Sequence, residues 1–230
     1  MGQLQALELL EKQYPHARIV LRYRNPWELL VAVILSAQCT DVTVNKVTDK
    51  LFQKYTELDD YISASLQDFE QDIKSTGFYH NKAKNILAAA KLVKEKFGGI
   101  VPKTMEEILI LPGVARKTAN VVLGNAYGVV EGIAVDTHVL RLSQRLRLVD
   151  LEKIGGKNFV EFEKAGKRVI DYKKDADPVK IEAELMKIIP RKNWFKTTYQ
   201  LIDHGRAVCR AQYPDCGHCL LRAVCPASRL

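Results

Sequence analysis

Residues 108–123 read ILILPGVARKTANVVL, and this stretch decides the fold of the middle of the chain. Apolar residues on both sides follow a helical spacing, which predicts two helices. Pro112 cannot continue a helix, so we expect the first helix to end at Leu111. Gly113 permits a positive φ and therefore a tight reversal of the chain. The stretch thus predicts a helical hairpin with its turn at Pro112-Gly113.

The start of the second helix, expected at about Val114, is suited to an anion. The first N–H groups of a helix have no partner inside the helix and lie at its positive end, an arrangement that binds phosphate. Arg116 and Lys117 add positive charge at the same place. Such a contact would hold a DNA backbone without reading its sequence. A simple connection between two helices would have the same pattern, so the hairpin alone leaves both interpretations open.

The composition favours an anionic partner. The 230 residues suit one or two compact lobes, and 47% of them are hydrophobic, which is enough for a sizeable core. Lys plus Arg is 35 and Asp plus Glu is 27, a net charge of +8, which favours nucleic acid first and an acidic membrane second. The longest clean apolar run, Leu29 to Leu35, is far below the roughly 20 residues of a membrane span. Gln3 and Glu8 interrupt any signal-peptide pattern, so we expect a cytoplasmic, nucleoid-associated protein, or a nuclear one in a eukaryote.

The rest of the chain also predicts helices, most of them with a recognisable start or stop signal. They are residues 4–12, a helix begun by Asn25-Pro26, one capped by Thr40 or Asp41, one over about 86–97 ended by Gly98-Gly99, one begun by the capping box Thr104–Glu107, one from Thr137 to about Arg147 capped by Asp136, one from Asp177-Pro178 to about Ile189, and one from Asn193 toward Cys209. Clear strand alternation is missing. Residues 150–177, rich in glycine and mixed charge, are expected to form a surface excursion with at most one helix. We therefore predict an all-α fold.

Four of the five cysteines lie in the last 22 residues: Cys209, Cys216, Cys219 and Cys225. A reducing compartment argues against structural disulfides, so four thiols close together in a polar tail indicate a metal or cluster site. Four thiolates suit either zinc or an iron–sulphur cluster, and the spacing alone leaves both possible. Cys39 stands apart in an apolar neighbourhood and is expected to be a small core residue.

Five blocks of the chain resemble the endonuclease III family of DNA glycosylases. The blocks are LSAQCTD at 35–41, GFYHNKAKNI at 77–86, LPGVARKTAN at 111–120, IAVDTHVLR at 133–141 and the tail Cys-x6-Cys-x2-Cys-x5-Cys. They occur in the family's order and are spread over most of the chain, from residue 35 to residue 225. Three features depart from the family pattern: Ala115 replaces the second glycine of the hairpin, Phe78 stands where leucine is expected, and residues 149–177 are longer.

The resemblance implies a bifunctional DNA glycosylase and AP lyase of base excision repair that removes oxidised pyrimidines. Lys117 occupies the nucleophile position, where a lysine amine can displace the damaged base and form a Schiff base with the sugar. The abasic strand is then cut by β-elimination. Asp136 is the family's catalytic aspartate, although an Asp before Thr-His-Val is also a good helix cap. The four tail cysteines are the implied ligands of a [4Fe–4S] cluster.

The resemblance also implies contacts to damaged double-stranded DNA, whose base must be flipped out of the stack. Gln38 is implied to fill the gap that the base leaves, and Phe78 is a candidate wedge. His138 is a candidate backbone contact. The hairpin contributes the remaining expected DNA-binding residues, which are Leu111, Gly113, Ala115, Arg116 and Thr118.

The implied architecture is two helical lobes with a DNA cleft between them. Residues 21–132 form a barrel-like helical lobe with the helix-hairpin-helix, and residues 1–20 with 133–230 form the cluster lobe. We expect a monomer with no membrane partner. Two other functions stay open: a monofunctional mismatch glycosylase on the same scaffold, and a non-catalytic DNA-binding module stabilised by a metal.

Overall fold

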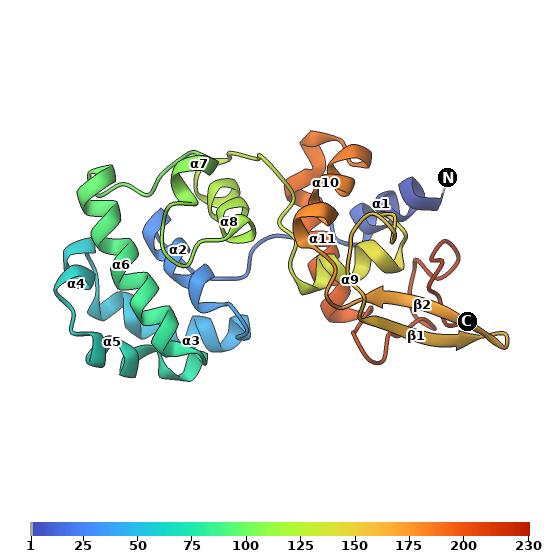
Figure 1. The fold of residues 1–230 in the computed structure, drawn as a ribbon, viewed down its shortest axis with the longest axis horizontal. Coiled ribbons are helices and arrows are strands. Elements are labelled where there is room, and N and C mark those ends of the chain that lie inside the picture. Colours follow the sequence, from blue (N-terminus) through green and yellow to red (C-terminus); the bar gives the residue numbers. More distant parts are fainter. Residues whose placement is uncertain (1) are drawn as a thin grey trace. The chain divides into compact units, whose positions relative to one another are not determined.

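The computed structural model describes residues 2–230, which divide into two compact units. One unit is Ile19–Glu131, and the other joins residues 2–18 to Gly132–Leu230. Both are built mainly from helices (Figure 1), which confirms the predicted fold class apart from one hairpin of strands. Among residues 2–230, no helix combines the length and the apolar character that crossing a membrane requires.

The unit Ile19–Glu131 packs around α2, Pro26–Leu35. Asn25 caps this helix as predicted, because its side chain accepts from the N–H of Glu28. Every residue from Glu28 to Leu35 is buried, as expected of a helix that is apolar on all sides. The other elements are α3 (Asp41–Lys54), α4 (Leu58–Ser63), α5 (Leu66–Ile73), a 3-10 turn (Lys74–Thr76), α6 (Tyr79–Phe97), α7 (Met105–Ile108) and α8 (Arg116–Tyr127). Helices α3, α6 and α8 contact α2 directly.

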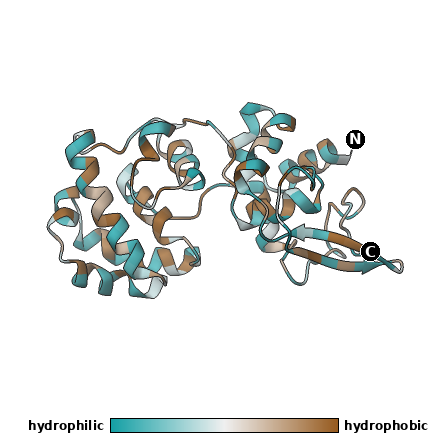
Figure 2. Ribbon diagram, viewed as in Figure 1, coloured by the Kyte–Doolittle hydropathy of each residue, from teal (hydrophilic) through white to brown (hydrophobic). Residues whose placement is uncertain are grey.

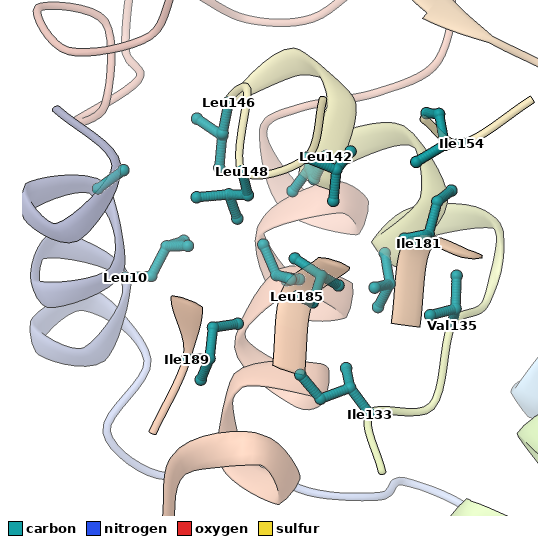
Figure 3. Close-up of a cluster of buried hydrophobic side chains, with 14 of the residues drawn as sticks. Leu10, Ile133, Val135, Leu142, Leu146, Leu148, Ile154, Ile181, Leu185 and Ile189 are labelled. Carbon is teal, nitrogen blue, oxygen red and sulfur yellow. The ribbon is translucent and has the colours of Figure 1, made fainter. Parts of the chain in front are cut away.

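The second unit has its own hydrophobic core, shown in Figure 3. Its helices are α1 (Gly2–Gln13), α9 (Thr137–Arg145), α10 (Pro178–Ile188) and α11 (Trp194–Ala207), with a 3-10 turn at Arg191–Asn193 before α11. Leu10 from α1, Leu142 from α9, Leu185 from α10 and Leu201 from α11 meet in this core. The N-terminal helix therefore folds with the C-terminal half of the chain.

Residues 150–177 were predicted wrongly, because they contain a β-hairpin instead of a loop with one helix. Strands β1 (Phe159–Lys164) and β2 (Lys167–Lys173) pair antiparallel, with Lys164 opposite Lys167. The turn is Ala165-Gly166, and both residues have positive φ, which matches the twist of a two-residue hairpin. Figure 2 shows hydrophobic stretches on both strands. The strands were not predicted because frequent Lys and Glu obscure the alternation of apolar and polar residues, and because the turn has Ala in place of Asn or Asp.

Candidate active site and cysteine cluster

The predicted reversal between two helices is present at Pro112-Gly113, but the first helix, α7, ends at Ile108 and not at Leu111 as predicted. Gly113 has φ +80°, and a Cβ at this position would lie 2.9 Å from the Cβ of Asn85, so only glycine fits. The helix α8 begins at Arg116, two residues later than predicted, because Ala115 still has extended backbone (φ −97°). Ala115 therefore needs no glycine-like conformation. Its methyl group also provides no acceptor for the first N–H groups of α8.

Lys117 is the second residue of α8 and is half-buried. Arg116 precedes it and is also half-buried. Leu111 and Thr118 have buried side chains, so they hold the hairpin against its own unit. The amine of Lys117 therefore lies in the first turn of a helix whose N-terminus has no side-chain cap, and such an N-terminus suits a phosphate.

Gln38 and Phe78 are exposed residues with strained backbone in the same unit. Gln38 has φ +53° and follows the end of α2, whereas Phe78 has φ +48° and precedes α6. A non-glycine residue held in the left-handed region costs about 1–3 kcal/mol, and such strain gathers at functional sites. Phe78 is 66% exposed although it is apolar. Each of the two residues therefore has an exposed side chain and a backbone conformation that costs free energy.

Asp136 follows the buried stretch 133–135 and caps α9. Its Oδ1 accepts hydrogen bonds from the N–H groups of His138 and Val139, both at 2.8 Å. The positive end of a helix interacts favourably with a negatively charged cap. Both bonds use Oδ1, which leaves Oδ2 outside the cap. The aspartate is half-buried, so the predicted capping role is present and a proton role is compatible with it.

His138 packs within its own unit. Its Nδ1 lies 3.2 Å from Nη2 of Arg141, and a Cβ added to Gly205 would approach that Nδ1 to 2.7 Å. Burial lowers the pKa of His138, with Arg141 and Arg206 acting in the same direction and Asp136 opposing it. His138 thus links α9 to Gly205 of α11, so part of its side chain packs within its own unit.

The four tail cysteines line one cavity. This cavity is partly open to solvent, and apolar residues such as Leu142, Leu146 and Leu221 form much of its wall. Cys209, Cys219 and Cys225 also pack against the core of the unit. Burial raises the pKa of Cys225 to about 11 and raises those of Cys209 and Cys219. A positive group between the sulphurs would offset this effect.

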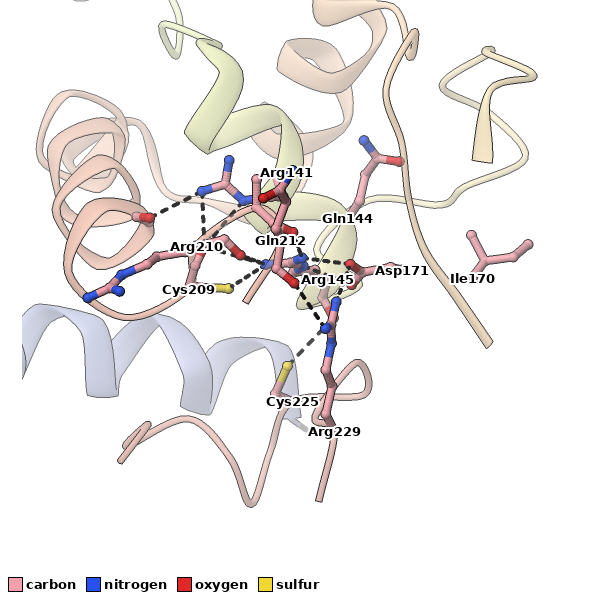
Figure 4. A network of polar contacts seen from close by, with 12 residues as sticks. Arg141, Gln144, Arg145, Ile170, Asp171, Cys209, Arg210, Gln212, Cys225 and Arg229 are labelled. Atoms are coloured by element: carbon pink, nitrogen blue, oxygen red, sulfur yellow. Dashed lines mark hydrogen bonds and ion pairs between the residues drawn. The ribbon is translucent and has the colours of Figure 1, made fainter. Parts of the chain in front are cut away.

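Sequence reasoning missed a buried ion pair beside this cavity, shown in Figure 4. Arg145 donates to both carboxylate oxygens of Asp171, at 2.8 and 2.6 Å, and its Nη1 donates to Sγ of Cys209 at 3.3 Å. Asp171 lies in a β-bulge, since Val160 pairs with Tyr172 while Glu161 pairs with Ile170. Bulges re-aim side chains, and this one turns Asp171 into the interior. No sequence signal pointed to it.

The comparisons with known proteins agree with this arrangement. Residues 31–159 match the family described as HhH-GPD superfamily base excision DNA repair protein. The chain is 48% identical to endonuclease III of Synechocystis sp. over 97% of its length and 91% of that protein. The corresponding values are 44%, 95% and 89% for endonuclease III of Bacillus subtilis. For endonuclease III of Escherichia coli K12 they are 35%, 96% and 93%.

Solved structures give the same result. A trapped covalent intermediate of an endonuclease III with DNA superposes with a TM-score of 0.85 at 42% identity, covering 99% of this chain and 97% of that one. A thermostable thymine-DNA glycosylase has a TM-score of 0.77 at 21% identity, which shows a shared fold. The chain belongs to the HhH-GPD superfamily of base excision DNA repair proteins, and within it to the endonuclease III family.

Proposed function

We propose that this enzyme is a bifunctional DNA glycosylase and AP lyase that removes oxidised pyrimidines from double-stranded DNA, with Lys117 as its nucleophile. One observation carries the proposal. A lysine stands in the first turn of α8, directly after the Gly113 reversal, in a chain 42% identical to an endonuclease III that was trapped covalently on DNA.

The chemistry begins at the amine of Lys117. Its lone pair attacks C1′ of the damaged nucleotide, and the C1′–N bond breaks as the base leaves with its electron pair and a proton. The C1′–O4′ bond of the sugar ring then breaks, so that O4′ takes a proton and the lone pair of the lysine nitrogen forms a protonated imine with C1′. This imine acidifies the hydrogen on C2′. Removal of that proton expels the 3′ phosphate by β-elimination, which cuts the strand. Water then hydrolyses the imine and frees Lys117.

Asp136 supplies the negative charge and the base in this proposal. The carboxylate lies at the positive end of α9, and its negative charge can stabilise positive charge developing on the sugar. It can also accept a proton through Oδ2, because the cap occupies Oδ1. The cap and the catalytic role therefore use different oxygens of one side chain.

Gln38 and Phe78 are proposed to enter the duplex when the base is flipped. Flipping costs a few kcal/mol, and filling the vacated space offsets part of this cost. The amide of Gln38 offers both donors and an acceptor, which suits it to face an unpaired base. The exposed ring of Phe78 is flat and apolar, as a wedge between bases requires.

The four cysteines are proposed to hold a [4Fe–4S] cluster. The resemblance of the cysteine spacing to that of the endonuclease III family favours a cluster over zinc. Residues 208–230 contain no helix or strand, so a group bound to Cys209, Cys216, Cys219 and Cys225 would fix this segment. When bound, the cluster supplies covalent cross-links between distant points of the loop. Arg145 donates to one of its ligands, Cys209.

Borohydride trapping tests the proposal and separates its alternatives. We expect the wild type to form a covalent adduct with abasic duplex DNA, and Lys117→Ala to form none. Base release without an adduct would indicate a monofunctional glycosylase. DNA binding with neither activity would indicate a non-catalytic module. We propose further that the protein acts as a monomer in the compartment that holds the DNA.

A further inference from the structure

Lys82 is a buried lysine that the proposed chemistry does not use. It lies in the first turns of α6 and is only 5% exposed. Its Nζ donates to the carbonyl oxygens of Leu35 and Thr76, both at 2.8 Å. Burial lowers its pKa, with the nearby thiol of Cys39 opposing this shift. An apolar side chain at this position would avoid the cost of desolvating an amine, so the two carbonyl contacts need an explanation.

The two carbonyls belong to the segments that carry the strained, exposed residues. Leu35 is the last residue of α2 and lies three positions before Gln38. Thr76 ends the 3-10 turn and lies two positions before Phe78. The backbone N–H of Lys82 also donates to the carbonyl of Phe78, at 3.3 Å. One residue therefore joins both segments, which are 40 positions apart in the chain (78 − 38).

The two contacts of Lys82 lie just before Gln38 and Phe78 in each segment, so they influence the positions of these two exposed residues. Gln38 and Phe78 both have left-handed backbone, which persists only where the surroundings determine it. The side chain of Thr76 donates to the carbonyl of Ile73 at 2.8 Å, which fixes the turn on which Lys82 acts. Gly77, with φ +68°, separates this fixed turn from Phe78.

We propose that Lys82 is a positioning residue that sets the distance between Gln38 and Phe78, so that both enter the DNA together when a base is flipped. This inference rests on the proposed function. Because Lys82 is buried, it would act without touching the substrate. Its contacts hold the two segments in a preformed arrangement. This lowers the entropy cost of ordering both side chains when they enter the DNA.

The test compares two substrates for one variant, Lys82→Met. The first is a duplex with one oxidised pyrimidine, where the base must be flipped. The second is a single-stranded abasic oligonucleotide, where no base has to leave a stack. We expect single-turnover cleavage of the duplex to fall by about tenfold or more, because part of the flipping cost is no longer offset. Cleavage of the single strand should stay within about twofold of wild type.

Lys84→Met is the matched control. Lys84 is an exposed lysine on the same helix, so the change removes an equal charge without touching the bridge. We expect it to leave the ratio of the two rates unchanged. An equal fall on both substrates for Lys82→Met would mean a general structural role, and unchanged rates on both would mean no role. Either result overturns the inference. A wild type that cleaves neither substrate would overturn the proposed function instead.

A coupling experiment gives a second readout. If Lys82 acts through the two loops, Lys82→Met should cost little more once Gln38→Ala and Phe78→Ala have been introduced. Full additivity of the losses on the duplex would contradict the inference. Lys82→Arg, which keeps donors at the end of a long side chain, should restore part of the duplex rate.

Discussion

Replacing Asp136 by Asn removes the charge of this residue but keeps its cap. An Asn amide oxygen can accept from the N–H groups of His138 and Val139 as Oδ1 now does at 2.8 Å. The lost interaction with the positive end of α9 is worth about 0.3–1 kcal/mol. Asp136→Ala loses the two hydrogen bonds as well, which costs about 1 kcal/mol and at most about 2. We therefore expect Asn to be the more stable variant.

The catalytic rates of the two variants should not follow this order of stability. If the carboxylate moves a proton and stabilises charge, both variants lose a contribution of about 10²–10⁴ in rate. Single-turnover excision and strand cleavage measure this loss, urea unfolding measures stability, and binding to an abasic-site analogue reports the DNA contacts. The account predicts near-normal binding for Asp136→Asn together with strongly reduced turnover. Turnover retained by Asn and lost by Ala in step with stability would show that the residue is only a cap.

Three further changes test other parts of the structure. Gly113→Ala should lower the free energy of unfolding by about 2–4 kcal/mol in a urea titration, because alanine is strained at positive φ and its Cβ would lie 2.9 Å from the Cβ of Asn85. A loss below about 0.5 kcal/mol would contradict this geometry. Asp171→Ala leaves Arg145 buried without its partner and should cost about 3–5 kcal/mol by the same assay; a cost within about 0.5 kcal/mol would show that the carbonyl contacts of Arg145 suffice. Cys216→Ser should bleach the visible absorption of the purified protein, whereas a colourless wild type that contains zinc would refute the cluster.

Most helices could be predicted because their boundaries depend on local chemistry. Thr104 accepts from the N–H of Glu107 at 3.3 Å, as the capping-box spacing predicted. Asp177 caps α10 through the N–H groups of Val179 and Lys180. Such caps involve residues two or three positions apart, so the sequence contains both partners. The reversal at Gly113 was predictable for the same reason.

The contacts of Arg145 and Lys82 could not be predicted, because their partners are distant in sequence. The β-hairpin pairs residues that are close in sequence, and it was missed because of its frequent Lys and Glu and its Ala-Gly turn. Arg145 donates to Asp171, which lies 26 positions later in the chain, and Lys82 donates to Leu35, which lies 47 positions earlier. Lys82 did leave one signal, a lysine on the face of α6 that also carries Ile86 and Val93. The roles of Lys117 and Asp136 came from the family resemblance, since spacing alone could not separate a nucleophile from a phosphate contact.

Mapping the covalent adduct tests the role of Lys117 as the nucleophile. Wild-type protein would be trapped on abasic DNA with borohydride, digested, and sequenced by mass spectrometry. The account predicts that the reduced sugar is attached to the Nζ of Lys117, and that the adduct disappears in Lys117→Ala while DNA binding persists. Attachment to a different lysine, or an undiminished adduct in Lys117→Ala, would contradict it.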